Sequence, residues 1–264
     1  MIRLAAIRVY PIKSLSGHCV SQCRILANGA LENDRCFALT DEAGAIVNSK
    51  RLAVLQTLRA EYDAQISRVW LGDLIRPRAE TFDLHQEAGK LGDWLSRFLE
   101  CKIQINKEVA GGFPDDMEFP GPTIVSTASL KMVASWFPEL TLEEVRDRFR
   151  ANLEIEGVPA FWEDRLFATD PEPVQLELGD VQWVGTNPCQ RCAVPARWNA
   201  SGVTHSHFVS TFVAQRESQL PNWTDADRFD HFYRLGVNTR IVHGEGSVIR
   251  VGDPIQLVGT KRSS

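Results

Sequence analysis

The sequence has no hydrophobic run long enough to span a bilayer, and its first eight residues lack the apolar core and cleavage site of a signal peptide. Six cysteines in 264 residues are too few for a disulfide scaffold. Basic residues are not in excess, because 29 Lys and Arg stand against 34 Asp and Glu. We therefore expect a cytoplasmic protein with reduced thiols that binds no membrane and no nucleic acid.

Short runs of apolar and β-branched residues, separated by turn signals, fill most of the chain and predict strands. Many short strands with close turns are typical of a barrel or a curled sheet. The predicted strands cover residues 4–10, 20–26, 36–40, 45–47, 55–62, 69–71, 152–155, 174–178, 181–184, 239–242, 247–251 and 255–258.

A few accessory helices are also predicted. Apolar residues recur three and four positions apart over 87–101, as in an amphipathic helix. A second helix is expected to begin near Ser126 or Thr127 and to end at Phe137, before Pro138. Thr141 and Glu144 have the spacing of a capping box, which begins a third helix ending near Phe149. The fold class is therefore mainly β with accessory helices (α+β).

The segment over 110–122 is rich in Gly and Pro and cannot sustain a helix or a strand ladder. It marks the best candidate for a linker. We place a domain boundary near residue 108, which gives an N-terminal domain over 1–107 and a second domain over 108–264.

The run Cys189-Gln190-Arg191-Cys192 follows a predicted strand and should occupy a rigid loop. Four interpretations remain open from the residues alone. The two cysteines can be small core residues, or zinc ligands together with Cys19 and Cys23. They can form a redox pair, although no helix is predicted directly after them. The fourth is a single thiolate ligand to a soft transition metal, next to the positive charge of Arg191.

Five motifs occur in one order along the chain: Tyr10-Pro11-Ile12-Lys13-Ser14, Asn33-Asp34-Arg35-Cys36-Phe37, Ser126-Thr127-Ala128-Ser129-Leu130, Phe149-Arg150-Ala151-Asn152 and the Cys189–Cys192 run. Together they resemble the MOSC family, in particular members with an N-terminal β-barrel domain, such as the mitochondrial amidoxime-reducing component and its bacterial relatives. The resemblance extends over nearly the whole chain. It implies an N-terminal β-barrel-like domain followed by a MOSC β-barrel, with a molybdenum cofactor (molybdopterin) between them.

The resemblance also implies roles for individual residues. Cys192 corresponds to the metal ligand and catalytic thiolate. The cofactor-binding residues would be Lys13, Ser14, Arg35, Ser126, Thr127, Ser129, Arg150, Asn152 and Arg191. A pterin phosphate carries about two negative charges, so an acidic protein must gather cations such as Lys13, Arg35 and Arg150 from distant segments.

The function implied by the resemblance is a molybdenum-dependent reductase of N-hydroxylated or N-oxide-type small molecules. The alternative is a carrier of sulfur or of the cofactor that uses Cys192, although the chain has no room for a pyridoxal-phosphate domain. No Gly-rich dinucleotide fingerprint follows a strand, and no cysteine follows Cys192 to ligate an iron–sulfur cluster. A reductase would therefore need an external electron-transfer protein.

Overall fold

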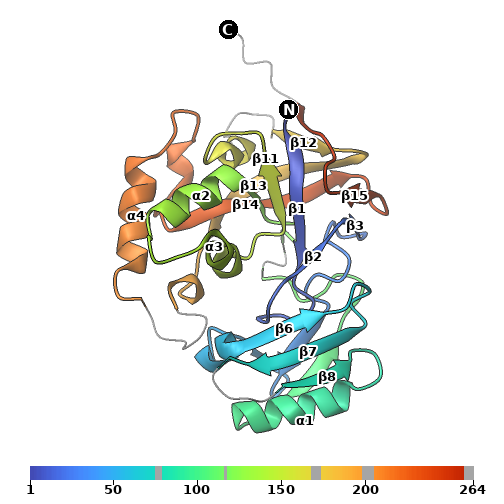
Figure 1. The fold of residues 1–264 in the computed structure, drawn as a ribbon. Helices are drawn as coiled ribbons and strands as arrows, with labels where there is room; N and C mark the ends of the chain where they lie inside the picture. Colours follow the sequence, from blue (N-terminus) through green and yellow to red (C-terminus); the bar gives the residue numbers. More distant parts are fainter. Residues whose placement is uncertain (75–78, 116–117, 168–173, 198–204, 259–264) are drawn as a thin grey trace.

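The computed structural model describes residues 1–74, 79–115, 118–167, 174–197 and 205–258. Its main element is an eight-stranded sheet with the order β16-β12-β13-β14-β10-β11-β1-β2 (Figure 1). Of the pairs in it, β10 and β11 run parallel and the others run antiparallel. The strands are β1 (Arg3–Val9), β2 (His18–Val20), β10 (Ile124–Ser126), β11 (Leu153–Glu156), β12 (Gln175–Leu178), β13 (Val181–Gln190), β14 (Arg234–His243) and β16 (Ile255–Val258).

The large sheet curls back on itself. The backbone N–H of Leu4 in β1 donates to the carbonyl of Asp253, and the N–H of Ile255 in β16 donates to the carbonyl of Ile2, both at 3.0 Å. A single isolated bridge joins Arg3 to Pro254. The sheet is therefore barrel-like, although this seam between β1 and β16 has no full ladder.

Three smaller sheets complete the β structure. They pair β3 (Gln22–Arg24) with β15 (Val248–Arg250), order β5 (Ile46–Val47), β4 (Phe37–Thr40) and β9 (Gln104–Lys107), and join β6 (Leu58–Tyr62), β7 (Arg68–Asp73) and β8 (Ala79–Asp83). Helix α1 (Ala88–Leu99) lies beside β8 at the lower end of the molecule (Figure 1). Its apolar stripe is buried, with Trp94 packing edge-on against Phe82.

Helices α2 (Thr127–Ser135), α3 (Leu142–Phe149) and α4 (Phe208–Ser218) gather on one side of the large sheet (Figure 1). The predicted capping box at the start of α3 is confirmed, since the Thr141 and Glu144 side chains each accept from the other's backbone N–H. Four short 3₁₀ segments are η1 (Ala53–Thr57), η2 (Trp162–Phe167), η3 (Val194–Ala196) and η4 (Ala226–Arg228). The prediction of a mainly β fold with accessory helices is confirmed.

Several predicted boundaries were wrong. The strand expected over 20–26 is split into β2 and β3, and the first part of the strand expected over 55–62 is 3₁₀ helix. Helix α2 begins at Thr127, near the predicted start, and ends at Ser135, two residues before the predicted end at Phe137. Strand β13 continues to Gln190, so Cys189 lies in a strand and not in a loop, because pairing with β14 extends the ladder beyond its apolar part.

The N-terminal strands are built into the second half of the chain. Strand β1 pairs with β11, and β3 pairs with β15. The division into 1–107 and 108–264 stays a prediction. None of the described helices is long and apolar enough to cross a membrane.

Candidate functional site

A cavity of about 1280 Å³ lies between segments from both halves of the chain. Eight basic and six acidic residues are among its described lining residues, so the cavity is locally cationic although the chain carries a net charge of −5. Seven of the predicted site residues line it, namely Lys13, Ser14, Arg35, Arg150, Asn152, Arg191 and Cys192.

Cys192 lies on the cavity wall just beyond the end of β13, and it is partly exposed. Its Sγ accepts a hydrogen bond from the backbone N–H of Val194 at 3.4 Å. The chain after Cys192 is held by buried Arg148 of α3, whose Nη1 donates to the carbonyls of Pro195 at 2.6 Å and Arg197 at 2.7 Å. The thiol therefore has a defined position on a wall that is fixed from beneath.

Arg191 anchors the same wall. Its Nε donates to the carbonyl of Leu235 at 3.0 Å, and its Nη1 donates to the carbonyl of Phe149 at 2.8 Å. These contacts link the end of β13 to β14 and to the end of α3. The guanidinium charge of Arg191 lies at the cavity, but most of its N–H groups already donate to backbone carbonyls.

Two other cations of the cavity, Arg35 and Arg150, lie close to the aromatic ring of Tyr10. The guanidinium carbon of Arg150 lies 4.0 Å from the ring centroid of Tyr10, and that of Arg35 lies 5.4 Å from it. Tyr10 is buried and donates its hydroxyl to the carbonyl of Ala151 at 3.2 Å. Burial raises its pKa to about 12, so the ring stays neutral and its negative face stabilises both cations.

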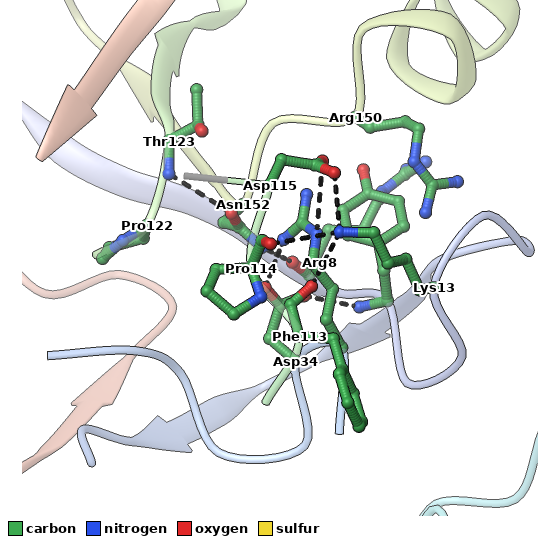
Figure 2. Close-up of polar contacts among 12 residues, drawn as sticks. Arg8, Lys13, Asp34, Phe113, Pro114, Asp115, Pro122, Thr123, Arg150 and Asn152 are labelled. Atoms are coloured by element: carbon green, nitrogen blue, oxygen red, sulfur yellow. Dashed lines mark hydrogen bonds and ion pairs between the residues drawn. The ribbon is translucent and has the colours of Figure 1, made fainter. Parts of the chain in front are cut away.

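Lys13 pairs with Asp115 in this cluster (Figure 2). Arg35 pairs with Asp34. Burial lowers the pKa of Lys13, while Asp115 opposes that change. Burial also disfavours the charge on Arg35, but Asp34 and Asp115 outweigh it and raise the pKa of Arg35. Arg35 therefore remains cationic at neutral pH, and Lys13 is held in an ion pair with Asp115.

Arg150 differs from its neighbours because no carboxylate of the described residues forms an ion pair with it. Its Nη1 donates to the carbonyl of Leu15 at 2.6 Å. Desolvation lowers its pKa, and nearby Arg35 adds to that effect. The residue ends α3 in the left-handed conformation, with φ of 51°, which turns the chain toward the cavity. Within the described residues, Arg150 is thus a cation at the cavity without an ion-pair partner, although Asp115 and Asp34 lie close enough to oppose the lowering of its pKa.

Ser14 and Asn152 make contacts within the protein. The Oγ of Ser14 accepts a hydrogen bond from the backbone N–H of Ser49 at 3.2 Å. The Asn152 amide donates to the carbonyl of Arg8 at 3.0 Å and accepts from the N–H of Thr123 at 3.2 Å. Asn152 therefore fixes the spacing between β1 and the strand that begins at Ile124.

The structure does not bring Ser126, Thr127 and Ser129 to this cavity. Ser126 caps α2 by accepting from the Ser129 N–H at 3.0 Å, and both serines are fully buried. Thr127 donates its hydroxyl to the carbonyl of Ile155 at 3.2 Å. The side chains at the start of α2 therefore form their hydrogen bonds inside the protein, with α2 itself and with the carbonyl of Ile155 in β11.

Sequence reasoning missed several lining residues. Arg8 pairs with Asp147 at 2.9 Å across the cavity wall, and Asp115 pairs with Lys13 at 2.7 Å. Asp115 lies in the predicted linker, and no local signal distinguishes it from its neighbours. Tyr10 is not a lining residue, but its ring lies beside the lining cations Arg35 and Arg150. It begins one of the recognised motifs, so its position was a usable signal.

The zinc interpretation finds no support in the part of the chain that the structure describes. Cys19 lines the cavity, whereas Cys23 is buried and directs its Sγ toward the carbonyls of Arg24 and Glu32. No group of three or more His, Cys, Asp or Glu residues with a metal-binding arrangement occurs within the described ranges.

Two family descriptions match the chain: the MOSC N-terminal beta barrel domain over residues 1–82 and the MOSC domain over residues 123–256. Molybdenum cofactor sulfurase 2 of Culex quinquefasciatus is 23% identical over 308 residues, which covers 97% of this chain and 37% of that protein. Molybdenum cofactor sulfurase 1 of Aedes aegypti is 22% identical over 260 residues, which covers 83% and 33%. The chain thus spans about a third of the length of these relatives.

A crystal structure of YiiM from Geobacillus stearothermophilus aligns with 53% of this chain and 54% of that chain, at 15% identity and a TM-score of 0.29. A structure described as a hypothetical protein gives the same coverage and identity with a TM-score of 0.31. These scores are too low to support a conclusion about fold or function.

Proposed function

Because the chain belongs to the MOSC domain family and is related to molybdenum cofactor sulfurases, we propose that its cavity binds a molybdenum cofactor and that the protein is a reductase of N-hydroxylated or N-oxide-type small molecules. The observation that carries the proposal is the position of the partly exposed Cys192 thiol on the wall of the same cavity as Lys13, Arg35 and Arg150. Cys19 and Cys189 also line this cavity, and the family motif selects Cys192 among the three.

The residues present fit such a group. A cavity of about 1280 Å³ exceeds the roughly 300–1,000 Å³ of an ordinary small-molecule pocket, which leaves room for both a cofactor and a substrate. No carboxylate of the described residues forms an ion pair with Arg150, which favours an anionic group such as a pterin phosphate there. A thiolate is also a suitable ligand for a soft transition metal.

Each residue has a separate task in this proposal. Cys192 would ligate the metal, while Arg148 and Arg191 hold the chain on either side of it by their bonds to backbone carbonyls. Lys13, Arg35 and Arg150 would neutralise the phosphate. When bound, the cofactor would supply two-electron oxygen-atom transfer, and the cavity walls would orient the substrate and exclude competing reactions. Electrons would come from a separate electron-transfer protein.

The test is to purify the chain from cells that make the cofactor and to measure molybdenum and the fluorescence of the oxidised pterin. Loaded protein is then given reduced viologen and a simple amidoxime or hydroxylamine. Stoichiometric molybdenum with reduction of the substrate supports the proposal. Full molybdenum occupancy without turnover would contradict the reductase function.

The second candidate is a carrier of sulfur or of the cofactor, favoured by the relatives named molybdenum cofactor sulfurases. A sulfur carrier would use Cys192 as a reactive thiol without bound metal. Intact-mass measurement of the purified chain distinguishes the two, because a persulfide adds one sulfur atom to the protein and a ligated metal protects the thiol from alkylation.

A further inference from the structure

All three donors of the Lys13 ammonium are used by one short segment (Figure 2). Its Nζ donates to the carbonyl of Phe113 at 2.8 Å and to that of Pro114 at 3.1 Å, and it pairs with Oδ1 of Asp115 at 2.7 Å. An ammonium group has three N–H bonds. A ligand that is to bind Lys13 must therefore displace at least one of these partners.

Asp115 also reaches the second cation of the cluster. Its Oδ2 lies 3.8 Å from Nε of Arg35. Partial desolvation raises the pKa of Asp115, but Arg35 and Lys13 outweigh that effect and hold the pKa at about 2. The side chain is therefore an anion that bridges two of the cations at the cavity.

The other acid in the cluster, Asp34, is fixed in place. Its Oδ1 accepts the backbone N–H of Tyr10 at 2.8 Å, its Oδ2 pairs with Arg35, and its side chain is only 10% exposed. The Asp115 side chain is 65% exposed. Asp34 is thus a permanent counter-ion, whereas the exposed Asp115 side chain can turn into solvent when another anion takes its place beside the buried Lys13.

We infer that Asp115 is an internal competitor for anions: its carboxylate occupies the place on Lys13 and Arg35 that an anionic group of a ligand takes, and the two exchange on binding. The inference rests on the proposed function only for identifying that group as the cofactor phosphate. A phosphate with about two negative charges cannot share Lys13 with a carboxylate without strong repulsion.

Arg150 is placed to receive the incoming anion first, because no described carboxylate pairs with it. Lys13 then exchanges one anion for another and never loses a counter-ion. The cost of displacing Asp115 lowers the affinity of every anion that uses Lys13. Removing the Asp115 carboxylate should therefore strengthen anion binding.

The experiment measures the Kd of inorganic phosphate by titration calorimetry on the full chain purified without cofactor. Asp115→Asn keeps the size of the side chain and removes its charge. An exposed ion pair contributes up to about 1 kcal/mol, and charge-assisted bonds contribute more, so we expect a Kd about three to ten times lower. The control is Asp41→Asn, which removes an acid paired with Arg51 at 2.9 Å outside the cavity lining. It should leave the Kd unchanged within about a factor of two.

Unchanged, weaker or undetectable phosphate binding in Asp115→Asn overturns the inference, because Asp115 would then support Lys13 or have no part in binding. In protein that carries Lys13→Gln, adding Asp115→Asn should no longer lower the Kd of phosphate. A lower Kd that persists there also overturns the inference. Molybdenum is measured separately on protein from cofactor-making cells. If the protein carries stoichiometric molybdenum but Asp115→Asn leaves the Kd of phosphate unchanged, the inference about Asp115 is wrong and the proposed function stands. If Asp115→Asn binds phosphate more tightly but the protein carries no molybdenum, the proposed function is wrong and the inference stands.

Discussion

Replacing Arg150 by methionine should weaken cofactor binding strongly while changing the stability of the cofactor-free protein little. The guanidinium of Arg150 faces the cavity, packs 4.0 Å from the Tyr10 ring centroid and donates to the carbonyl of Leu15. It has no carboxylate partner within the described residues. Methionine keeps an unbranched chain that can pack on the same ring, but it removes the charge.

The magnitude follows from these contacts. Losing a charged hydrogen bond costs about 1.5–3 kcal/mol, and losing a cation–π contact costs about 1–2 kcal/mol. Against this, desolvation of an unpaired charge costs several kcal/mol, which the variant recovers. The free energy of unfolding should therefore change by less than about 2 kcal/mol in either direction. A lost charge-assisted contact to phosphate should raise the Kd of the cofactor by about 10 to 150 times.

Two measurements check this prediction. Urea denaturation of the cofactor-free proteins gives the stability change, and molybdenum remaining after dialysis gives cofactor retention. Arg51→Met is a matched control, since Arg51 pairs with Asp41 outside the cavity lining. Wild-type retention in Arg150→Met would refute the assignment of Arg150 to the phosphate. Destabilisation by more than about 4 kcal/mol would refute the view that this charge contributes little to the fold.

Three other predictions concern the thiols, a buried acid and the electron source. Cys192→Ser should lose most of its molybdenum while Cys189→Ser keeps it, and equal losses by metal analysis would contradict a single thiolate ligand. Burial, and secondarily Asp164, raise the pKa of Glu163 to about 7 from its usual 4.5. The stability that its protonated form gives is complete below pH 4.5 and disappears as the pH rises through about 7. Glu163→Gln should therefore be more stable than wild type by about 3 kcal/mol at pH 8 and little different at pH 4.5, as measured by urea unfolding; equal stability at pH 8 would contradict this. Finally, cofactor-loaded protein should turn over with reduced viologen but not with NADH alone, and spectrophotometric NADH oxidation by the purified chain would contradict the need for a partner.

Local signals in the sequence determined a large part of the secondary structure. The capping box of Thr141 and Glu144 and the apolar stripe of α1 depend on residues within four positions of one another, so they could be read directly. Helix α4 was missed because its apolar residues are not on one regular stripe. Phe208 and Phe212 are buried by aromatic rings from distant segments, among them Phe137, Phe149 and Tyr233.

The family resemblance carried by the motifs predicted Cys192 and the cations Lys13, Arg35 and Arg150 as site residues, and their roles stay predictions. Only the tertiary structure decided which of them share a cavity. It placed Ser126 and Ser129 in the interior, since the start of α2 uses its own serine as a cap.

Contacts between residues far apart in the sequence could not be predicted from local sequence patterns either. The seam between β1 and β16 joins residues about 250 positions apart, and Asp115 meets Lys13 across 100 residues of chain. The sequence determined which side chains could carry charge and sulfur. Folding decided which charges are already paired, because that depends on segments brought together by packing of the whole chain.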